Sequence, residues 1–222
     1  MGFTVDIDTG GTFTDGFFLS GDRSASVKVP TTPHDLTVCF LKCIEAGAKR
    51  FDLPMEDLLY QTDVIRFSNT IGTNTIIQRD GSKVGLIVSN GHSDLAPCAE
   101  SAGKPPLVQP EMVREIRGEI GPDGQVAAEP QAEEVLARAQ ELIDAGARCL
   151  VLALAGSDRN PANERAARTI IKDLYPRDYL GSVPVFLASD ISRRSGEAQR
   201  INSAVLNAYI HAKLVRLLYK AG

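Results

Sequence analysis

The sequence predicts an α/β fold with an antiparallel strand opening, a mixed sheet and flanking helices. Two observations support this fold class. From Phe3 to Pro30 the pattern is strand, turn, strand, turn, strand, with alternation in FTVDID and a double glycine before TFTDGFFL. Farther along, apolar strands such as CLVLALAG (149–156) alternate with amphipathic helices, which is typical of parallel strands buried on both faces.

Hydrophobic period and turn residues predict the other elements in order. The helix over 33–50 has Thr31 or Thr32 available as its cap, and the region 98–130 is a Pro- and Gly-rich excursion that contains one strand. The predicted elements are a helix over 33–50, strands over 64–69 and 83–91, a helix within 70–81, a strand over 112–120, a helix over 130–145, a strand over 149–156, a helix over 163–174, a strand over 183–189 and a helix over 197–219.

Composition and charge exclude several classes of function. The chain has 222 residues, of which 43% are hydrophobic and 23% charged, and its formal net charge is −4. Lys and Arg form no cluster, so neither nucleic acid nor an anionic membrane is expected as a partner. The N-terminus lacks the features of a secretion signal, and no apolar run approaches the roughly 20 residues that span a bilayer. The sequence therefore predicts a cytoplasmic protein.

Four cysteines are present, at positions 39, 43, 98 and 149. Cys39 and Cys43 lie four apart on a predicted helix, where they share one face and could ligate a metal. The favoured interpretation is that reduced cytosolic thiols behave as small apolar residues, because no His or second Cys pair lies near them.

The stretch DIDTGGTFTD, residues 6–15, is the strongest candidate for a functional site. Gly10 and Gly11 allow backbone dihedrals closed to other residues, and their N–H groups can approach a bound phosphate. Thr12 and Thr14 place hydroxyls on one face of the outgoing strand. A carboxylate beside phosphate, here Asp8, requires a cation between them, and Mg²⁺ is the usual one. The alternative is an ordinary hairpin corner, for which Asp, Gly and Thr are also suitable.

A resemblance to a known family favours the phosphate interpretation. IDTGGTFTD resembles the first phosphate-binding motif of the hydantoinase/oxoprolinase family, I-D-x-G-G-T-F-T-D, and matches all of its specified positions from Ile7 to Asp15. FSNTIGTNTIIQRDGSKVGLIVSNG (67–91) resembles H-G-T-T-x-x-T-N-x-x-x-x-R-x-G and the strand that follows it. Five residues match this second motif: Thr70, Thr73, Asn74, Arg79 and Gly81. Phe67, Ser68 and Asn69 replace its His, Gly and first Thr, so the role of that histidine is not carried over.

Two further segments resemble the family in the right order. NPANE (160–164) is similar to N-P-x-H-E, with Asn163 in place of histidine, and NSAVLNAYI (202–210) is similar to a helix-opening segment near the end of the family's N-terminal region. The resemblance thus covers nearly the whole chain.

The resemblance implies a fold and a set of site residues. It places the chain in a ribonuclease H-like lobe of the actin-like ATPases, with residues 1–200 as the first lobe and 201–222 as the start of the next region. It also implies ATP and Mg²⁺ as cofactors, with Asp8 as the catalytic and metal-side carboxylate that holds Mg²⁺ through water. The implied ATP-phosphate ligands are Gly10, Gly11, Thr12, Thr14, Thr70, Thr73 and Asn74.

The resemblance also implies a class of reaction. Family members phosphorylate a poorly reactive oxygen of a ketone enol, of bicarbonate or of a cyclic amide. IQRDGSKVGLIVSNG (77–91) is more similar to the carboxylase form of the motif, which predicts an acetone- or acetophenone-type carboxylase subunit acting on a ketone with bicarbonate. The alternative is an ATP-dependent hydantoinase or 5-oxoprolinase.

Completeness and partners are the remaining expectations. No second phosphate motif follows residue 15, so the chain is expected to be a first lobe that lacks its own C-terminal lobe and has no ATPase activity alone. Other subunits or a homo-oligomer are expected as partners. A non-catalytic binding or assembly module is the further alternative, in which the apolar stripe of the last helix meets another protein, although a core helix explains that stripe more simply.

Overall fold

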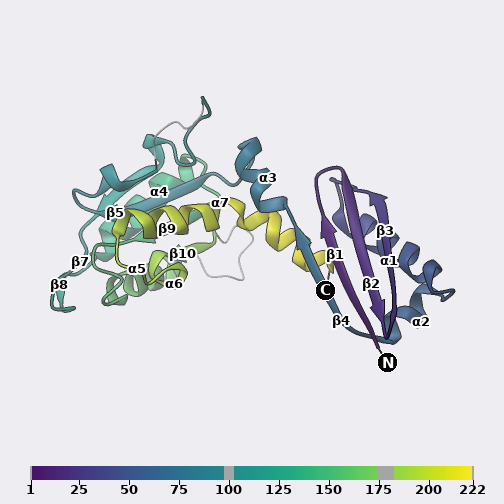
Figure 1. Cartoon of the computed structure of the whole chain (residues 1–222). Helices are drawn as coiled ribbons and strands as arrows, with labels where there is room; N and C mark the ends of the chain where they lie inside the picture. Colours follow the sequence, from purple (N-terminus) through teal and green to yellow (C-terminus); the bar gives the residue numbers. More distant parts are fainter. Residues whose placement is uncertain (1, 98–102, 175–182, 222) are drawn as a thin grey trace. The chain divides into compact units, whose positions relative to one another are not determined.

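A computed structural model of the chain describes residues 2–97, 103–174 and 183–221 (Figure 1). Contacts between residues divide the chain into two compact units. Unit 1 comprises Met1–Gln78 and Lys213–Gly222, and unit 2 comprises Arg79–Ala212. The expected first-lobe region 1–200 therefore contains parts of both units. Cys98 lies outside the described residues.

Unit 1 is built on a four-stranded mixed sheet with the order β3-β2-β1-β4. The first three strands form the predicted antiparallel meander, and β4 returns parallel to β1. The strands are β1 (Phe3–Thr9), β2 (Phe13–Ser20), β3 (Arg23–Pro30) and β4 (Thr62–Asn69). The mixed sheet expected from the sequence is confirmed.

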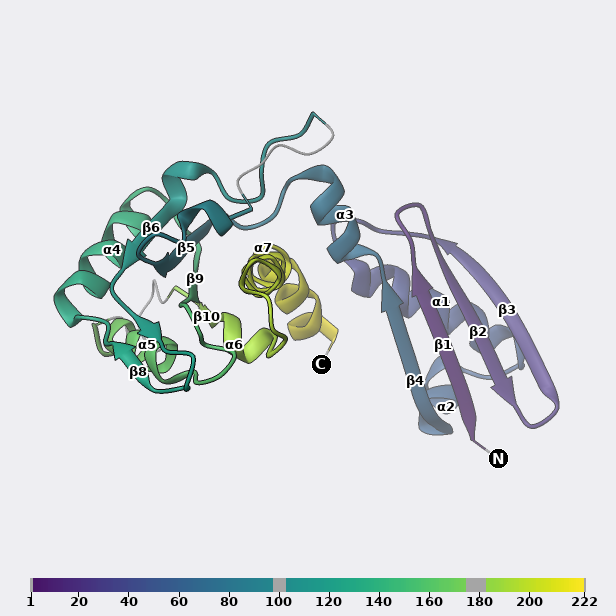
Figure 2. The same cartoon turned by 60° about the vertical axis from the view of Figure 1, so that its left-hand side comes forward.

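Helices cover one face of this sheet (Figure 2). They are α1 (Leu36–Arg50) and α2 (Met55–Tyr60), and α3 (Ile71–Gln78) follows β4. Helix α1 begins three residues later than predicted, because the Asp35 carboxylate caps it by accepting hydrogen bonds from the backbone N–H and the hydroxyl of Thr37. Thr32 instead donates its hydroxyl to the Asp35 carbonyl oxygen. Helix α2 was not predicted.

Two glycines allow α1 to approach the sheet closely. A Cβ at Gly16 in β2 would lie 2.4 Å from Cys43 Sγ, and a Cβ at Gly47 in α1 would lie 2.2 Å from the Phe18 ring. Such distances are far below van der Waals contact, so neither position accepts a side chain without rearrangement. The core between helix and sheet is apolar and includes Phe3, Val5, Ile7, Phe18, Ile44 and Leu58.

Unit 2 contains a four-stranded parallel sheet with the order β10-β9-β5-β6. Its strands are β5 (Val84–Ser89), β6 (Val113–Ile116), β9 (Cys149–Ala153) and β10 (Val185–Leu187). Strands β5 and β9 are buried along their whole length, as the continuous apolar runs predicted. Its helices are α4 (Ala132–Asp144), α5 (Ala162–Leu174), α6 (Ala188–Ile191) and the first part of α7 (Glu197–Ala221), whose residues from Lys213 onward belong to unit 1.

The helices of unit 2 lie on both faces of its sheet. Helices α4 and α5 pack together on one face, and α7 covers the other (Figure 2). The first part of the predicted stripe of α7 is part of the core, since Ile201, Ala204, Val205 and Ala208 are buried in it, whereas Ala212 is exposed and Val215 is only partly buried. This favours the core-helix interpretation of that stripe. The expected boundary at 200/201 falls inside α7, which is continuous.

The prediction of an excursion over 98–130 was wrong in one respect. The strand expected over 112–120 is two strands, separated at Arg117 and Gly118. Its first part, β6, is an edge strand of the parallel sheet, and its second part, β7 (Glu119–Ile120), pairs with β8 (Val126–Ala128) as a small hairpin. Two short 3-10 turns complete the elements, η1 (Ser93–Leu95) and η2 (Pro110–Met112). No helix within the described ranges is long and apolar enough to cross a lipid bilayer.

Candidate functional site

The double-glycine corner joins β1 to β2 in unit 1. The backbone N–H of Gly10 donates to the Phe13 carbonyl oxygen at 3.0 Å, which closes the turn. Neither Gly10 nor Gly11 has a positive φ, so the expectation that they provide dihedrals closed to other residues was wrong. A Cβ at Gly11 would stand 3.9 Å from Asn74 Nδ2, an ordinary van der Waals distance, and one at Gly10 would stand 3.3 Å from the Phe13 carbonyl oxygen, which is tight. The corner therefore lies close to the start of α3.

Hydrogen bonds among the hydroxyls of Thr9, Thr14 and Thr31 stabilise the corner on its buried side. Thr14 is fully buried, and its Oγ1 lies 3.0 Å from Thr31 Oγ1 and 3.3 Å from Thr9 Oγ1. Thr31 donates its hydroxyl to the Gly10 carbonyl oxygen at 3.0 Å and its N–H to the Thr12 carbonyl oxygen at 2.9 Å. Thr14 is thus a supporting hydroxyl. Thr12 precedes β2 and is exposed, so the two threonines do not share the strand face that alternation predicted.

The start of α3 is attached to the same corner. Thr70 donates its N–H to the Thr9 carbonyl oxygen at 3.2 Å, and Asn74 Nδ2 donates to Thr70 Oγ1 at 3.1 Å. Asn69 supplies an N-terminal cap by accepting the N–H of Ile71 at 3.1 Å. The motif residues Thr70 and Asn74 are therefore brought to the glycine corner.

A cleft of about 340 Å³ opens between these elements. Four residues of α3 line it at helical spacing, namely Ile71, Asn74, Thr75 and Gln78. Thr73 lies outside this stripe and is exposed. The remaining lining residues are Thr9, Gly10, Gly11, Thr31, Pro33, His34, Asp35, Leu36 and Thr70, with Lys213, Arg216 and Leu217 from the end of α7.

Two helices begin at this cleft, because both Leu36 of α1 and Ile71 of α3 line it. Helix N-termini present backbone N–H groups and the positive end of the helix dipole. At α1 the Asp35 carboxylate already caps this end and adds an acidic group to the lining, so the surroundings that favour a negatively charged ligand are the start of α3 and the backbone of Gly10 and Gly11.

Asp8 lies on the other face of the sheet. Successive strand residues alternate between faces, so the buried Thr9 points toward the helices while Asp8 points away. Ser68 donates its hydroxyl to Asp8 Oδ1 at 2.5 Å. Asp8 lines a second, shallower groove with Asp6 and Asp15, where Asp6 pairs with Arg66 at 2.8 Å and Asp15 with Lys28 at 2.9 Å.

The structure thus brings together Gly10, Gly11, Thr70 and Asn74 at one cleft, but not every predicted residue. Thr14 lies beneath the corner, Thr12 and Thr73 are exposed outside the cleft lining, and Asp8 occupies the opposite face. Sequence reasoning missed Thr9, Thr31 and Asn69. The sequence carried a usable signal for Asn69 alone, since an Asn directly before a helical pattern is a common N-terminal cap.

The fold and the corner together define a family. Residues 4–175 match the family described as the hydantoinase/oxoprolinase N-terminal region. The chain belongs to this family.

Particular relatives narrow the comparison. The chain is 36% identical to the acetophenone carboxylase gamma subunit of Aromatoleum aromaticum over 95% of its own length and 31% of that protein. It is 26% identical to the caprolactamase subunit alpha of Pseudomonas jessenii over 97% of its length and 32% of that protein. A nucleotide-free structure of acetone carboxylase, a protein described as ATP-dependent, superposes with a TM-score of 0.87 at 26% identity, over 98% of this chain and 33% of that one. The chain therefore spans about a third of the length of these relatives.

Proposed function

We propose that the chain forms the first ATP-binding lobe of an ATP-dependent enzyme with an actin-like, ribonuclease H-like architecture. The observation that carries the proposal is the cleft at the glycine corner, where Gly10 and Gly11 meet the N-terminal ends of α1 and α3. Backbone N–H groups and the dipole of α3 favour a polyphosphate there, whereas the end of α1 already carries the Asp35 carboxylate. The match to relatives that are subunits of ATP-dependent enzymes supports ATP as the source of that polyphosphate.

The residues of the corner have different roles in the proposed binding of ATP. Gly10 and Gly11 form the phosphate cradle, and Thr70 and Asn74 hold the α3 end of the cleft, whereas Thr12 is exposed outside the cleft lining and is a weaker candidate. Thr14 keeps the corner in place through its buried hydroxyl contacts. Thr73 is a weaker candidate for a phosphate ligand, because it is exposed outside the cleft.

Asp8 is the proposed carboxylate on the metal side. Among the described residues, Ser68 donates to its Oδ1, and Oδ2 is left for a water of a hydrated cation. Asp8 lies on the face of the sheet opposite the proposed phosphate cleft, so this arrangement offers no direct contact between the carboxylate and a metal bound to the phosphates. A bound Mg²⁺ would offset phosphate charge during transfer.

The reaction we propose is ATP-dependent activation of an oxygen by phosphorylation, most consistent with a ketone carboxylase of the acetone or acetophenone type. The QRDGSKVGLIV segment and the carboxylase relatives support this choice. Hydrolysis of a cyclic amide is the second candidate, since a caprolactamase subunit is also a relative. Both activities require the rest of a protein three times as long, and we propose that further subunits take part.

Nucleotide binding tests the proposal directly. We expect Mg-ATP to bind the 222-residue chain weakly, because a single lobe makes only part of the contacts to the nucleotide. We also expect the chain alone to show no measurable ATP hydrolysis. Gly11→Val places a branched side chain toward Asn74 and should weaken binding at least about tenfold, equivalent to 1.4 kcal/mol. Ser24→Val, at an exposed position of β3, is the control and should bind as the wild type does.

Isothermal titration calorimetry with Mg-ATP, and with Mg²⁺ omitted, measures these differences. Equal binding by Gly11→Val and wild type would refute the cleft as the phosphate site. Robust ATP hydrolysis by the chain alone, abolished by Asp8→Asn, would contradict the single-lobe proposal. For the longer protein with its partner subunits, ATP hydrolysis stimulated by acetophenone or acetone with bicarbonate would support the carboxylase, and stimulation by hydantoin, 5-oxoproline or caprolactam would favour the hydrolase.

A further inference from the structure

The parallel sheet of unit 2 contains a topological switch point. The chain leaves β5 toward β6 on one side, and β9 and β10 are added on the other side of β5. In open sheets of this kind, ligands bind at the carboxyl ends of the two strands where the order reverses. Here these ends are Ser89 of β5 and Ala153 of β9.

Helix α7 brings two charged side chains to this switch point. Glu197 and Arg200 lie three residues apart, so they share one face of the helix. Glu197 contacts His92 Nδ1, in the loop after β5, at 2.7 Å, and Arg200 Nη1 lies 3.3 Å from Asp158 Oδ1, in the loop after β9. The start of α7 is therefore fixed by the His92–Glu197 contact on one side of the switch point and by the Arg200–Asp158 ion pair on the other.

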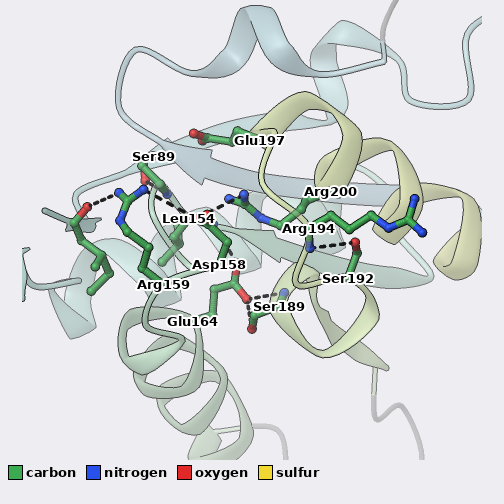
Figure 3. Close-up of polar contacts among 12 residues, drawn as sticks. Ser89, Leu154, Asp158, Arg159, Glu164, Ser189, Ser192, Arg194, Glu197 and Arg200 are labelled. Carbon is green, nitrogen blue, oxygen red and sulfur yellow. Dashed lines mark hydrogen bonds and ion pairs between the residues drawn. The ribbon is translucent and has the colours of Figure 1, made fainter. Parts of the chain in front are cut away.

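Arg200 is unusual because it is buried and incompletely bonded. Its side chain is 3% exposed, and its Nε has no hydrogen-bond partner among the described residues. Figure 3 shows it extending from α7 toward the loop after β9. A buried donor without an acceptor is costly, so native proteins keep one rarely and usually at a site with a ligand, an ion or a water.

Two of the neighbouring polar side chains are already occupied (Figure 3). Ser89 donates its hydroxyl to the Gly118 carbonyl oxygen and accepts the N–H of Ala155. The Arg159 Nε and Nη2 atoms donate to the carbonyl oxygens of Gly121 and Ile120, at 3.0 and 3.1 Å. Of the described residues beside Asp158, Ser157 also has a buried hydroxyl oxygen without a hydrogen-bond partner, so two unsatisfied polar atoms belong to this part of unit 2.

The buried Glu164 carboxyl is also satisfied. It accepts the N–H of Leu154 at 3.1 Å and the N–H and hydroxyl of Ser189 at 3.0 and 2.6 Å. Burial raises its pKa, which favours its neutral form. The other ionisable side chains near the switch point are Asp158 and Glu197, with Arg159, Arg200 and His92 as their partners.

We propose that the switch point of unit 2 is a binding site for a small oxyanion, anchored by Arg200 Nε between the carboxyl ends of β5 and β9. A guanidinium N–H matches an oxyanion oxygen in geometry and charge. Carboxylate, bicarbonate and phosphate share this chemistry. Asp158 opposes the ligand by its charge, so affinity is modest and depends on that residue. The site lies in unit 2 and does not depend on whether unit 1 binds ATP.

Arginine side-chain NMR of the ¹⁵N-labelled 222-residue chain tests the site. The Arg200 Nε–H signal is assigned by its loss in Arg200→Lys, which keeps the charge and removes this donor. Acetate, bicarbonate and phosphate are titrated separately at constant ionic strength, with chloride as the reference anion. We expect a saturable shift of the Arg200 signal with one or more of the oxyanions, and the one that binds identifies the ligand type. The signal of Arg168, which pairs with Asp190 at 2.9 Å on α6, should not move.

Asp158→Asn is the second variant, and it keeps the proposal falsifiable if Arg200→Lys does not fold. Removing the opposing charge should tighten oxyanion binding about tenfold or more, because the two negative groups would lie only a few ångströms apart. If no oxyanion shifts the Arg200 signal in either protein, or if chloride shifts it equally, the proposal is overturned. An unchanged affinity in Asp158→Asn would likewise refute the placement of the ligand beside Arg200.

Discussion

Replacing Glu164 by Ala should destabilise unit 2 strongly. The Glu164 carboxyl is fully buried and accepts hydrogen bonds from Leu154 N–H and from the N–H and hydroxyl of Ser189. It thereby connects the chain after β9 to the start of α6. Alanine leaves these donors without an acceptor in a buried place.

The magnitude follows from these contacts. Each buried donor left unsatisfied costs about 1–3 kcal/mol, and two of the three are backbone N–H groups that cannot turn elsewhere. Removing a buried carboxyl also relieves its desolvation, which offsets part of the loss. We expect Glu164→Ala to lower the free energy of unfolding by about 3 kcal/mol, a large part of the 5–15 kcal/mol typical of a domain.

The pH dependence of stability has a defined sign. Burial raises the pKa of Glu164 in the folded chain above the value of about 4.3 in an unfolded one. Between these two pKa values the folded state holds more protons, so the contribution of Glu164 to stability falls as the pH rises through that window. Glu164→Gln does not titrate. Its stability deficit relative to wild type should therefore shrink as the pH is raised from below 4 toward neutrality.

Guanidinium chloride unfolding followed by circular dichroism measures both effects, and hydrogen exchange of β9 and α6 assigns the loss to unit 2. Glu134→Ala is the control, since its exposed carboxylate accepts one backbone N–H, that of Arg117, at 2.9 Å, and should cost less than about 1 kcal/mol. A Glu164→Ala variant within 1 kcal/mol of wild type would refute the assigned role. So would a deficit of Glu164→Gln that widens with rising pH.

Three further predictions concern unit 1 and the buried thiols. Gly16→Ala should cost about 1–3 kcal/mol in chemical unfolding, because its Cβ would lie 2.4 Å from Cys43 Sγ, and adding Cys43→Ala should recover part of the loss; no recovery would contradict the contact. Thr14→Val should cost about 1–2 kcal/mol by removing buried hydroxyl contacts, and a neutral result would show that they contribute nothing. Burial raises the pKa of Cys43 to about 11 and of Cys149 to about 12, so a thiol reagent at pH 8 should label both far more slowly in folded than in denatured chain, as mass spectrometry can measure.

Hydrophobic period was sufficient to predict most of the fold. The alternation in FTVDID and the continuous apolar run of CLVLALAG identified β1 and β9, and the helical stripes identified α1, α4 and α7. The edge strand β6 was assigned to an excursion because its four residues lie among glycines and prolines, and its pairing with β5 is a long-range contact. Short elements such as α2 carry too few residues for a period to be visible.

The candidate site was predictable in its residues but not in its arrangement. The motif identified Gly10, Gly11, Thr70 and Asn74, and these do line one cleft. Their surroundings depend on Thr31, which is distant in sequence and whose hydroxyl contacts arise from the pairing of β2 with β3. The two glycines were expected to need a positive φ, which neither has, and a Cβ at Gly11 would meet Asn74 Nδ2 at an ordinary contact distance of 3.9 Å.

The bonds of Thr31 have a consequence for the thermodynamics of binding. Its hydroxyl and N–H hold two carbonyl oxygens of the corner, those of Gly10 and Thr12, and it also contacts the buried Thr14. A loop that is already restrained by such hydrogen bonds would lose little conformational entropy on binding a ligand. The glycines, which would be the most mobile residues of a free loop, are thereby ordered in advance. The corner loses its conformational entropy when the chain folds, so this loss does not lower the affinity for a ligand.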